Sequence, residues 1–270
     1  MRYALGDPSP PMMNSHADPS ALVMSATISP PKAMIGSVRN DPHERMLEYQ
    51  EAFRFYLALP DHYVDTLIVF ENSGADLGVF RDIADAARSS KRIHLVNTST
   101  DYPAEMGKGY GEFMMMDQGL AALQASGVAS NKKFWKVTGR LQIVNIEQML
   151  ARAPDDFEMY CDLRKVPLIG DALGGNRWME LRVFAFTMAG YDRYLRGNYG
   201  LGIGLETYFF EILCAAMKSG TGSGIVPRFN VQPVIDGFCG YNNKSYLSLE
   251  YRLKNLVRST GRLVFPNLWL

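Results

Sequence analysis

Three apolar runs in this chain each adjoin a short segment that contains glycine and polar residues. This repeated pattern constrains the fold of the chain most strongly. The segments are Glu71-Asn72-Ser73-Gly74, residues 107–112 and residues 133–140. An open α/β sheet places such residues at the carboxyl ends of its strands, where its binding crevice lies. The second and third segments also combine glycine with cations, which suits an anionic ligand such as a diphosphate.

Alternating strand-like and helix-like segments support a sheet of this kind. Strands are expected at residues 21–27, 66–70, 92–96 and 134–137, and helices at residues 41–59, 77–89 and 110–125. Asp41, Pro42 and Glu44 provide a cap, a first-turn proline and a capping-box acid for the first helix. Short connections between the elements predict a mostly parallel sheet with helices on both faces.

The second half of the chain has a less regular pattern. We expect a helix at residues 146–153, strands near 157–163 and at 180–187, a helix at 205–217 and an extended segment at 227–237. The fold class predicted is therefore α/β, a single domain with an α+β elaboration at its C-terminal end. Residues 1–20 are expected to be a loosely ordered lead-in to two halves, residues 21–150 and residues 151–270.

Composition excludes several classes of function. The 28 basic and 28 acidic residues cancel, so net charge gives no reason to expect nucleic-acid binding. Cys161, Cys214 and Cys239 form no C-x-x-C pair, which favours reduced thiols in a cytoplasmic protein. No apolar run approaches the ~20 residues of a membrane span. The basic, aromatic tail at residues 251–270 suits peripheral contact with the inner face of a membrane. The alternative is a final helix and strand that pack on the core with solvated charges.

The segment after the second strand carries polar side chains suited to a nucleoside. Glu71 can accept hydrogen bonds from a ribose or a base, and Asn72 and Ser73 can add orienting bonds. The alternative is structural, because Asn-Ser-Gly makes a good turn and Glu71 can cap the next helix.

The glycine-rich segment at residues 107–112 precedes a predicted helix. Lys108, Gly109 and Glu112 lie where backbone N–H groups at a helix start favour negative charge, so we expect them to contact the ligand. The spacing matches neither the dinucleotide fingerprint nor the Walker loop. A flexible surface loop is the structural alternative.

The strand at residues 134–137 ends in the strongest candidate for a diphosphate site. Lys136 and Arg140 bracket Thr138 and Gly139, and they supply a point charge and a planar fork of donors. These cations can neutralise a diphosphate, so no metal or other cofactor is expected. A solvated turn is the alternative.

Three carboxylates are candidates for a catalytic base. Glu206 stands at the start of a predicted helix, Glu211 lies further along it, and Glu180 opens a strand with Arg182 on the same face. Glu206 is the preferred candidate. Glu180 can instead form a structural ion pair with Arg182, and Glu211 can be a buried anchor.

The order of these features resembles the glycosyltransferase A fold, and most closely bacterial enzymes that build lipopolysaccharide, O-antigen or capsule. The likeness covers roughly residues 21–270 and is strongest over 66–147. It implies that Glu71 holds the nucleoside, that Lys108 lies beside the donor sugar, and that Glu206 is the base. Many such enzymes carry a metal-binding Asp-x-Asp where this chain has Thr138-Gly139-Arg140.

The resemblance implies a glycosyltransferase, with Glu206 in the place of the base in inverting relatives. The departure from Asp-x-Asp, with Lys136 and Arg140 nearby, predicts that the enzyme needs no metal. Its partners would be a nucleotide-sugar donor and a saccharide or lipid-linked acceptor, held by residues 21–150 and 151–270 respectively. The alternatives are a catalytically silent saccharide-binding or scaffold protein on the same fold, and a nucleotidyltransferase that makes sugar nucleotides.

Overall fold

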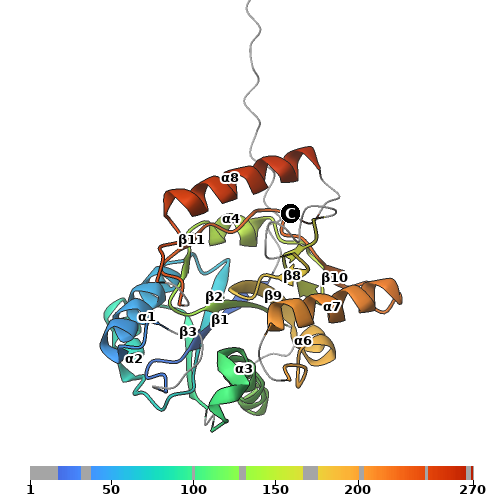
Figure 1. Ribbon diagram of the computed structural model, residues 1–270. Helices are drawn as coiled ribbons and strands as arrows, with labels where there is room; N and C mark the ends of the chain where they lie inside the picture. Colours follow the sequence, from blue (N-terminus) through green and yellow to red (C-terminus); the bar gives the residue numbers. More distant parts are fainter. Residues whose placement is uncertain are drawn as a thin grey trace, which may run out of the picture.

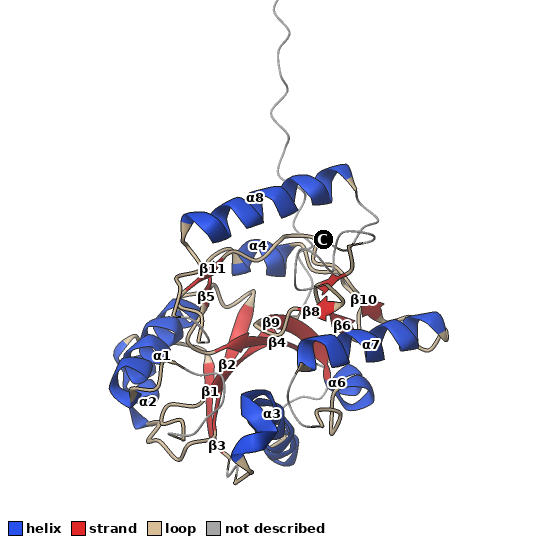
Figure 2. Ribbon diagram, in the orientation of Figure 1, coloured by secondary structure: helices blue, strands red, loops and turns tan. Residues whose placement is uncertain are grey.

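The protein is built around one seven-stranded sheet. Its computed structural model describes residues 18–31, 38–98, 101–127, 132–166, 176–200, 204–240, 243–265 and 269. The strands of the sheet are β1 (Ser20–Ala26), β2 (Val64–Glu71), β3 (Arg92–Asn97), β4 (Lys133–Thr138), β6 (Met159–Tyr160), β9 (Val183–Thr187) and β10 (Ile225–Val226). Their order across the sheet is β10-β6-β9-β4-β1-β2-β3. Figures 1 and 2 show the sheet between two groups of helices.

The sheet reverses its direction of growth between β1 and β4. β1 to β4 are mutually parallel, with β2 and β3 on one side of β1 and β4 on the other. β9 is antiparallel to both β4 and β6, so six of the seven strands run the same way. In an open α/β sheet the crevice at such a reversal, beyond the carboxyl ends of the strands, is the usual binding place.

Both faces of the sheet are buried, because the central strands carry apolar side chains in both directions. Leu22 and Met24 of β1 join a core cluster with α1 (Pro42–Leu57), α2 (Gly78–Ala86) and α4 (Ile146–Ala151). Ala21 and Val23 join a second cluster with α3 (Gly107–Ala125), α6 (Met188–Tyr194) and α7 (Leu205–Lys218). The predicted fold class, a mostly parallel sheet flanked by helices, is confirmed.

Several boundaries differ from those predicted. The glycine-rich segment at residues 107–112 does not precede a helix but forms the first turns of α3. The expected strand at 180–187 begins only at Val183, and the region 157–163 divides into β6 and the start of β7 (Leu163–Arg164). The predicted cap of α1 is present, since Asp41 Oδ1 accepts a hydrogen bond from the Glu44 N–H at 2.9 Å.

Residues 151–270 extend the sheet beyond β4 and add smaller elements beside it. They contribute β6, β9 and β10 to the sheet, a hairpin-like pair of β7 with β8 (Trp178–Met179), and β11 (Ile235–Asp236), which pairs with β5 (Gln142–Ile143). A one-turn η1 (Ala104–Met106) precedes α3. Helix α8 (Leu249–Val264) crosses the top of the view in Figure 1 and includes most of the basic, aromatic tail, for which a final helix was one of the two alternatives.

Other expectations fall partly outside the described residues. Of the lead-in at residues 1–20, only residues 18–20 are described, and Ser20 already belongs to β1. No helix in the described part of the chain has the length and apolar character needed to cross a membrane.

Candidate functional site

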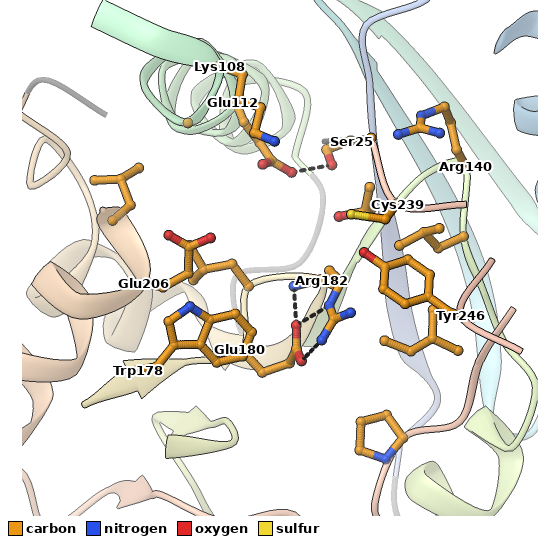
Figure 3. Close-up of a pocket in the computed structure, with 18 of the residues that line it drawn as sticks. Ser25, Lys108, Glu112, Arg140, Trp178, Glu180, Arg182, Glu206, Cys239 and Tyr246 are labelled. Carbon is orange, nitrogen blue, oxygen red and sulfur yellow. Dashed lines mark hydrogen bonds and ion pairs between the residues drawn. The ribbon is translucent and has the colours of Figure 1, made fainter. Parts of the chain in front are cut away.

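A cavity of about 860 Å³ lies beyond the carboxyl ends of β1 and β4. Its walls come from the start of α3, the turn after β4, the β7–β8 pair, the start of α7 and the inner face of α8. Figure 3 shows Lys108 and Glu112 on one side of this cavity and Glu180, Arg182 and Trp178 on the opposite side. Among the described residues, its charged lining side chains are Arg45, Lys108, Glu112, Arg140, Asp162, Arg164, Glu180, Arg182, Glu206 and Arg258.

The floor of the cavity contains a charged pair between β4 and α3. Phe134 and Lys136 alternate with Trp135 along β4, so Lys136 points toward α3, where its side chain is fully buried. Lys136 Nζ lies 2.6 Å from Glu112 Oε1 and donates to the Leu181 carbonyl at 2.7 Å. The prediction that Lys136 binds a diphosphate does not fit this position, because its ammonium is enclosed and compensated.

Glu112 therefore acts as an anchor for the charge of Lys136. Ser25 Oγ donates to the same carboxylate oxygen at 2.6 Å, as Figure 3 shows. Burial opposes ionisation of Glu112, but the charge and hydrogen bond of Lys136, together with Ser25, hold the pKa of this carboxyl below its usual value. Glu112 thus lines the cavity as a carboxylate that is already engaged by Lys136 and Ser25.

The turn after β4 has a structural reason for its glycine. A Cβ atom on Gly139 would lie 2.7 Å from the Ser25 carbonyl oxygen, so the close approach of the β1 and β4 ends requires glycine. Thr138 and Arg140 both line the cavity. Arg140 Nη1 contacts Glu48 Oε2 at 3.1 Å, and the charges of Tyr49 and Glu48 outweigh burial to raise the pKa of Arg140.

Glu71, Asn72 and Ser73 lie outside the cavity lining. Glu71 is fully buried, and its carboxylate accepts the backbone N–H groups of Ile28, Ser73 and Ala75 at 2.9–3.1 Å. It also accepts a hydrogen bond from the Ser73 hydroxyl. These bonds commit both oxygens of Glu71 to the backbone, so the contacts match the structural alternative rather than a ribose site.

Asn72 ties three elements together. Its Oδ1 accepts the Thr27 hydroxyl at 2.6 Å, and its Nδ2 donates to the Gly111 carbonyl at 3.3 Å. Asn72 thus links the ends of β1 and β2 to α3.

The first turn of α3 faces the cavity with Lys108 and Gly109. No side chain caps this end of the helix, so its first backbone N–H groups and the helix dipole favour negative charge there. Lys108 is exposed, which leaves its ammonium accessible from the cavity. This arrangement fits the predicted contact of Lys108 and Gly109 with an anionic ligand.

The three candidate bases have different environments. Glu180 is fully buried, with Oε1 2.6 Å from Arg182 Nε and Oε2 3.1 Å from Arg164 Nη2. Burial opposes ionisation of Glu180, but these arginines outweigh it and lower its pKa to about 2, so Glu180 does not take up a proton near neutral pH. Glu211 pairs with Arg177 and is not part of the cavity lining.

Of the three, Glu206 alone both lines the cavity and has no partner among the described residues. It lies in the first turn of α7, after Gly204, whose φ of 68° places the chain in the left-handed region. Among the described residues, Glu206 makes no hydrogen bond or ion pair, whereas Glu112, Asp162 and Glu180 each have a cationic partner. Figure 3 shows its carboxylate between the α3 side and the arginine side.

Several lining residues were not predicted. Arg45, Arg164, Trp178, Tyr246 and Arg258 all face the cavity. The i, i+4, i+7 spacing of Tyr251, Asn255 and Arg258 was a signal available in the sequence, because it places three cavity-lining polar residues on one face of a helix.

No set of three or more His, Cys, Asp or Glu side chains within the described residues is arranged to hold a metal ion. Glu48, Glu112 and Glu180 are each engaged with lysine or arginine.

Comparison with known proteins gives structural likeness only. No protein-family model matches the chain, and no curated protein sequence matches it. An inositol-1-phosphate CTP transferase from T. maritima is 14% identical, with 90% of this chain and 98% of that chain covered and a TM-score of 0.46. A mannosyltransferase from Pyrobaculum calidifontis, in complex with GDP-Man and Mn²⁺, is 11% identical over 92% of this chain and 64% of its own, with a TM-score of 0.46.

A 4-diphosphocytidyl-2C-methyl-D-erythritol synthase from Anaerococcus prevotii is 13% identical, with 90% of this chain and 97% of that chain covered and a TM-score of 0.44. At this level of likeness the fold class rests on the sheet topology of the chain itself.

Proposed function

We propose that this protein is a glycosyltransferase that moves a sugar from a nucleotide-sugar donor to a saccharide or lipid-linked acceptor. The observation that carries the proposal is the position of Glu206. This side chain is the one carboxylate of the described cavity lining that has no cationic partner, and the same cavity is lined by Lys108, by a helix start and by Arg140, which is largely buried beside Glu48. A free base and an anion site in one cavity are the two requirements for displacement of a nucleoside diphosphate.

In the proposed reaction, Glu206 accepts the proton of an acceptor hydroxyl. The hydroxyl oxygen forms a bond to the anomeric carbon of the donor sugar, while the bond between that carbon and the diphosphate oxygen breaks. The electron pair of the broken bond leaves with the nucleoside diphosphate, whose charge Lys108, Arg140 and the first N–H groups of α3 stabilise. Direct displacement of this kind inverts the anomeric centre.

Metal independence is part of the proposal. A guanidinium and an ammonium at the ends of β4 and α3 offer the diphosphate the positive charge that a divalent ion supplies in other sites. Lys136 holds Glu112 in position through their ion pair. The hydrogen bonds of Glu71, Asn72 and Ser73 hold the neighbouring strand ends in position.

Replacement of Glu206 tests the proposal. Glu206→Gln keeps the size of the side chain but removes the base, so release of nucleoside diphosphate from UDP- or GDP-sugars should fall about 10²–10⁴-fold. Donor binding, measured by thermal shift, should persist. Glu211→Gln on the same helix is the matched control, since Glu211 lies outside the cavity lining and should leave turnover unchanged. Normal turnover in Glu206→Gln would exclude Glu206 as the base.

A second candidate function is nucleotidyl transfer to a sugar phosphate. The observation that favours it is the excess of cations in the cavity, where six lysine and arginine side chains meet four carboxylates among the described lining residues. Such an excess also suits a nucleoside triphosphate. The products distinguish the two functions, because a nucleotidyltransferase releases pyrophosphate and a glycosyltransferase releases a nucleoside diphosphate. A scaffold or silent saccharide-binding protein releases neither.

We further propose that the acceptor is lipid-linked, that the protein works at the inner face of a membrane, and that its product belongs to a surface polysaccharide. The support is the orientation of α8, whose polar face lines the cavity while its apolar face points outward. Exposed fractions on that outer face are 82% for Leu249, 62% for Leu253, 63% for Leu256 and 64% for Val257. A helix with this division of faces can lie in a bilayer interface.

A further inference from the structure

The wall of the cavity opposite α3 contains three arginines that come from distant parts of the sequence. Arg164 belongs to β7, Arg182 precedes β9, and Arg258 lies on the inner face of α8. We call these three residues the arginine cluster. Glu180 lies among them and pairs with both Arg164 and Arg182.

The described residues do not fully balance the positive charge of the arginine cluster. Asp162, the other carboxylate on this wall, is paired with Arg262. Glu180 is therefore the one carboxylate of the described residues left to compensate Arg164, Arg182 and Arg258. The cluster retains an excess of two positive charges in a partly buried position, where uncompensated charge is costly.

Arg258 and Arg164 both carry donors that have no acceptor among the described residues. Arg258 makes no hydrogen bond or ion pair with any described residue, although it lines the cavity. Arg164 Nε is buried without a hydrogen-bond acceptor. Burial and the neighbouring charge of Arg258 outweigh Glu180 and lower the pKa of Arg164 to about 10, and burial likewise lowers the pKa of Arg258. An anion would satisfy both the donors and the charge.

Aromatic rings hold the other two guanidinium groups in place. Arg164 Cζ lies 4.3 Å from the centroid of the Trp178 ring, and Arg182 Cζ lies 4.8 Å from that of Tyr246. Stacked guanidinium planes are restrained in orientation, so less freedom is lost when they bind a ligand. Figure 3 shows Trp178, Tyr246 and Arg182 around this wall, across the cavity from Lys108.

We infer that the arginine cluster is a second anion site, which binds a phosphate monoester group on the acceptor substrate. Guanidinium forks match phosphate oxygens, and an excess of two charges matches a phosphate dianion better than a carboxylate. The assignment to the acceptor rests on the proposed function, in which the donor diphosphate occupies the opposite side of the cavity at Lys108 and Arg140. The phosphate can belong to a soluble sugar phosphate or to a lipid.

Thermal shift with inorganic phosphate at pH 8 tests the site directly, with ionic strength held constant by chloride. Phosphate should raise the Tm of the wild-type protein and of Arg152→Met, an exposed arginine outside the cavity lining. Arg258→Met should bind phosphate at least about tenfold more weakly, because one charge-assisted hydrogen bond is worth about that factor. Since Arg258 makes no hydrogen bond or ion pair with the described residues, the variant should fold with unreduced stability.

A second arm separates the acceptor from the donor. UDP and GDP are added at saturation, with and without phosphate. Additive shifts are expected, because the two anions occupy different sides of the cavity. Competition between phosphate and the bound nucleotide would overturn the assignment to the acceptor, since the cluster would then hold the donor diphosphate. Phosphate binding without any nucleotide binding would contradict the proposed function but leave the anion site standing.

A third arm identifies the source of the phosphate. Phosphatidylcholine vesicles with and without phosphatidic acid are tested for co-flotation of wild-type protein and Arg258→Met. If Arg258→Met loses the flotation that depends on phosphatidic acid, the phosphate belongs to a lipid. If Arg258→Met floats as the wild type does but no longer binds inorganic phosphate, the phosphate belongs to a soluble substrate. No phosphate shift in the wild type, or an equal shift in Arg258→Met, would overturn the inference.

Discussion

The position of Lys136 in the sequence predicts a ligand-binding cation, but its contacts in the structure are those of a buried ion pair. At the end of an apolar strand, it has the position of a ligand-binding cation, yet its ammonium is enclosed by Glu112 and by backbone and hydroxyl oxygens. The sequence does not reveal this, because Glu112 is 24 positions away and meets Lys136 only when α3 packs on β4. Glu71 is a similar case, since its oxygens are consumed by backbone N–H groups that no spacing identifies.

Lys136→Met should destabilise the protein by about 3 kcal/mol, because it leaves the Glu112 carboxylate without its buried partner. Chemical denaturation with urea measures the change in the free energy of unfolding. The double variant Lys136→Met with Glu112→Gln should recover part of the loss, since no charge is then left uncompensated. Arg193→Met, which breaks the exposed pair with Glu158, is the control and should change stability little. A loss in the double variant as large as in Lys136→Met would argue against this account.

Glu180 predicts a pH dependence of stability. Although burial opposes ionisation, Arg182 and Arg164 lower its folded-state pKa to about 2 from an ordinary value of 4.5. A lowered folded-state pKa stabilises the folded protein above pH 4.5, and this stabilisation is lost as the pH falls toward 2. Between pH 5 and pH 3, wild-type protein should therefore lose on the order of 1 kcal/mol more unfolding free energy than Glu180→Gln. If urea denaturation shows the same loss of unfolding free energy in both proteins between pH 5 and pH 3, the proposed pairing of Glu180 is contradicted.

At the scale of elements, strong periodic patterns were predictable and weak ones were not. The central strands β1 to β4 and helices α1 and α7 follow from apolar runs and caps, and their predicted positions are confirmed to within a few residues. The start of α3 was missed because glycine is a poor helix former, and packing of Phe113 and Met116 in the core overrides that preference. The arginine cluster joins residues 164, 182 and 258, which no local spacing connects.

Helix α8 inverts the usual arrangement of a surface helix, because its polar face lies inward along the cavity and its apolar face is exposed. If this face contacts a bilayer, Leu253→Asp with Val257→Asp should abolish flotation with anionic vesicles. Inorganic phosphate binding should persist, since both residues point away from the cavity lining. Asp85→Asn, an exposed substitution on α2, serves as the control. Unchanged flotation of the double variant would show that this face of α8 does not bind the bilayer.

At the scale of the whole molecule, the cavity exists because one sheet joins both halves of the chain. Residues 21–150 provide the parallel strands and the helix start that favour an anion, and residues 151–270 provide Glu206 and the arginine cluster. The sequence predicted a binding crevice at the carboxyl ends of the strands, but the strand order that places it at β1 and β4 comes from the structure. The sequence did not predict which charges face each other there, since these depend on side chains that pack across the sheet.

The most direct test of the central claim is a thermal-shift measurement with UDP, GDP, CMP and UMP, each in EDTA and in Mn²⁺. Our account predicts a rise in Tm for one nucleotide in EDTA, because a ligand at one hundred times its Kd adds about 2.7 kcal/mol to the folded state. The rise should survive in Glu206→Gln, because the proposed mechanism places this side chain against the acceptor and not against the nucleotide. A rise that requires Mn²⁺ would contradict metal independence, and no rise with any nucleotide would contradict the proposed transferase.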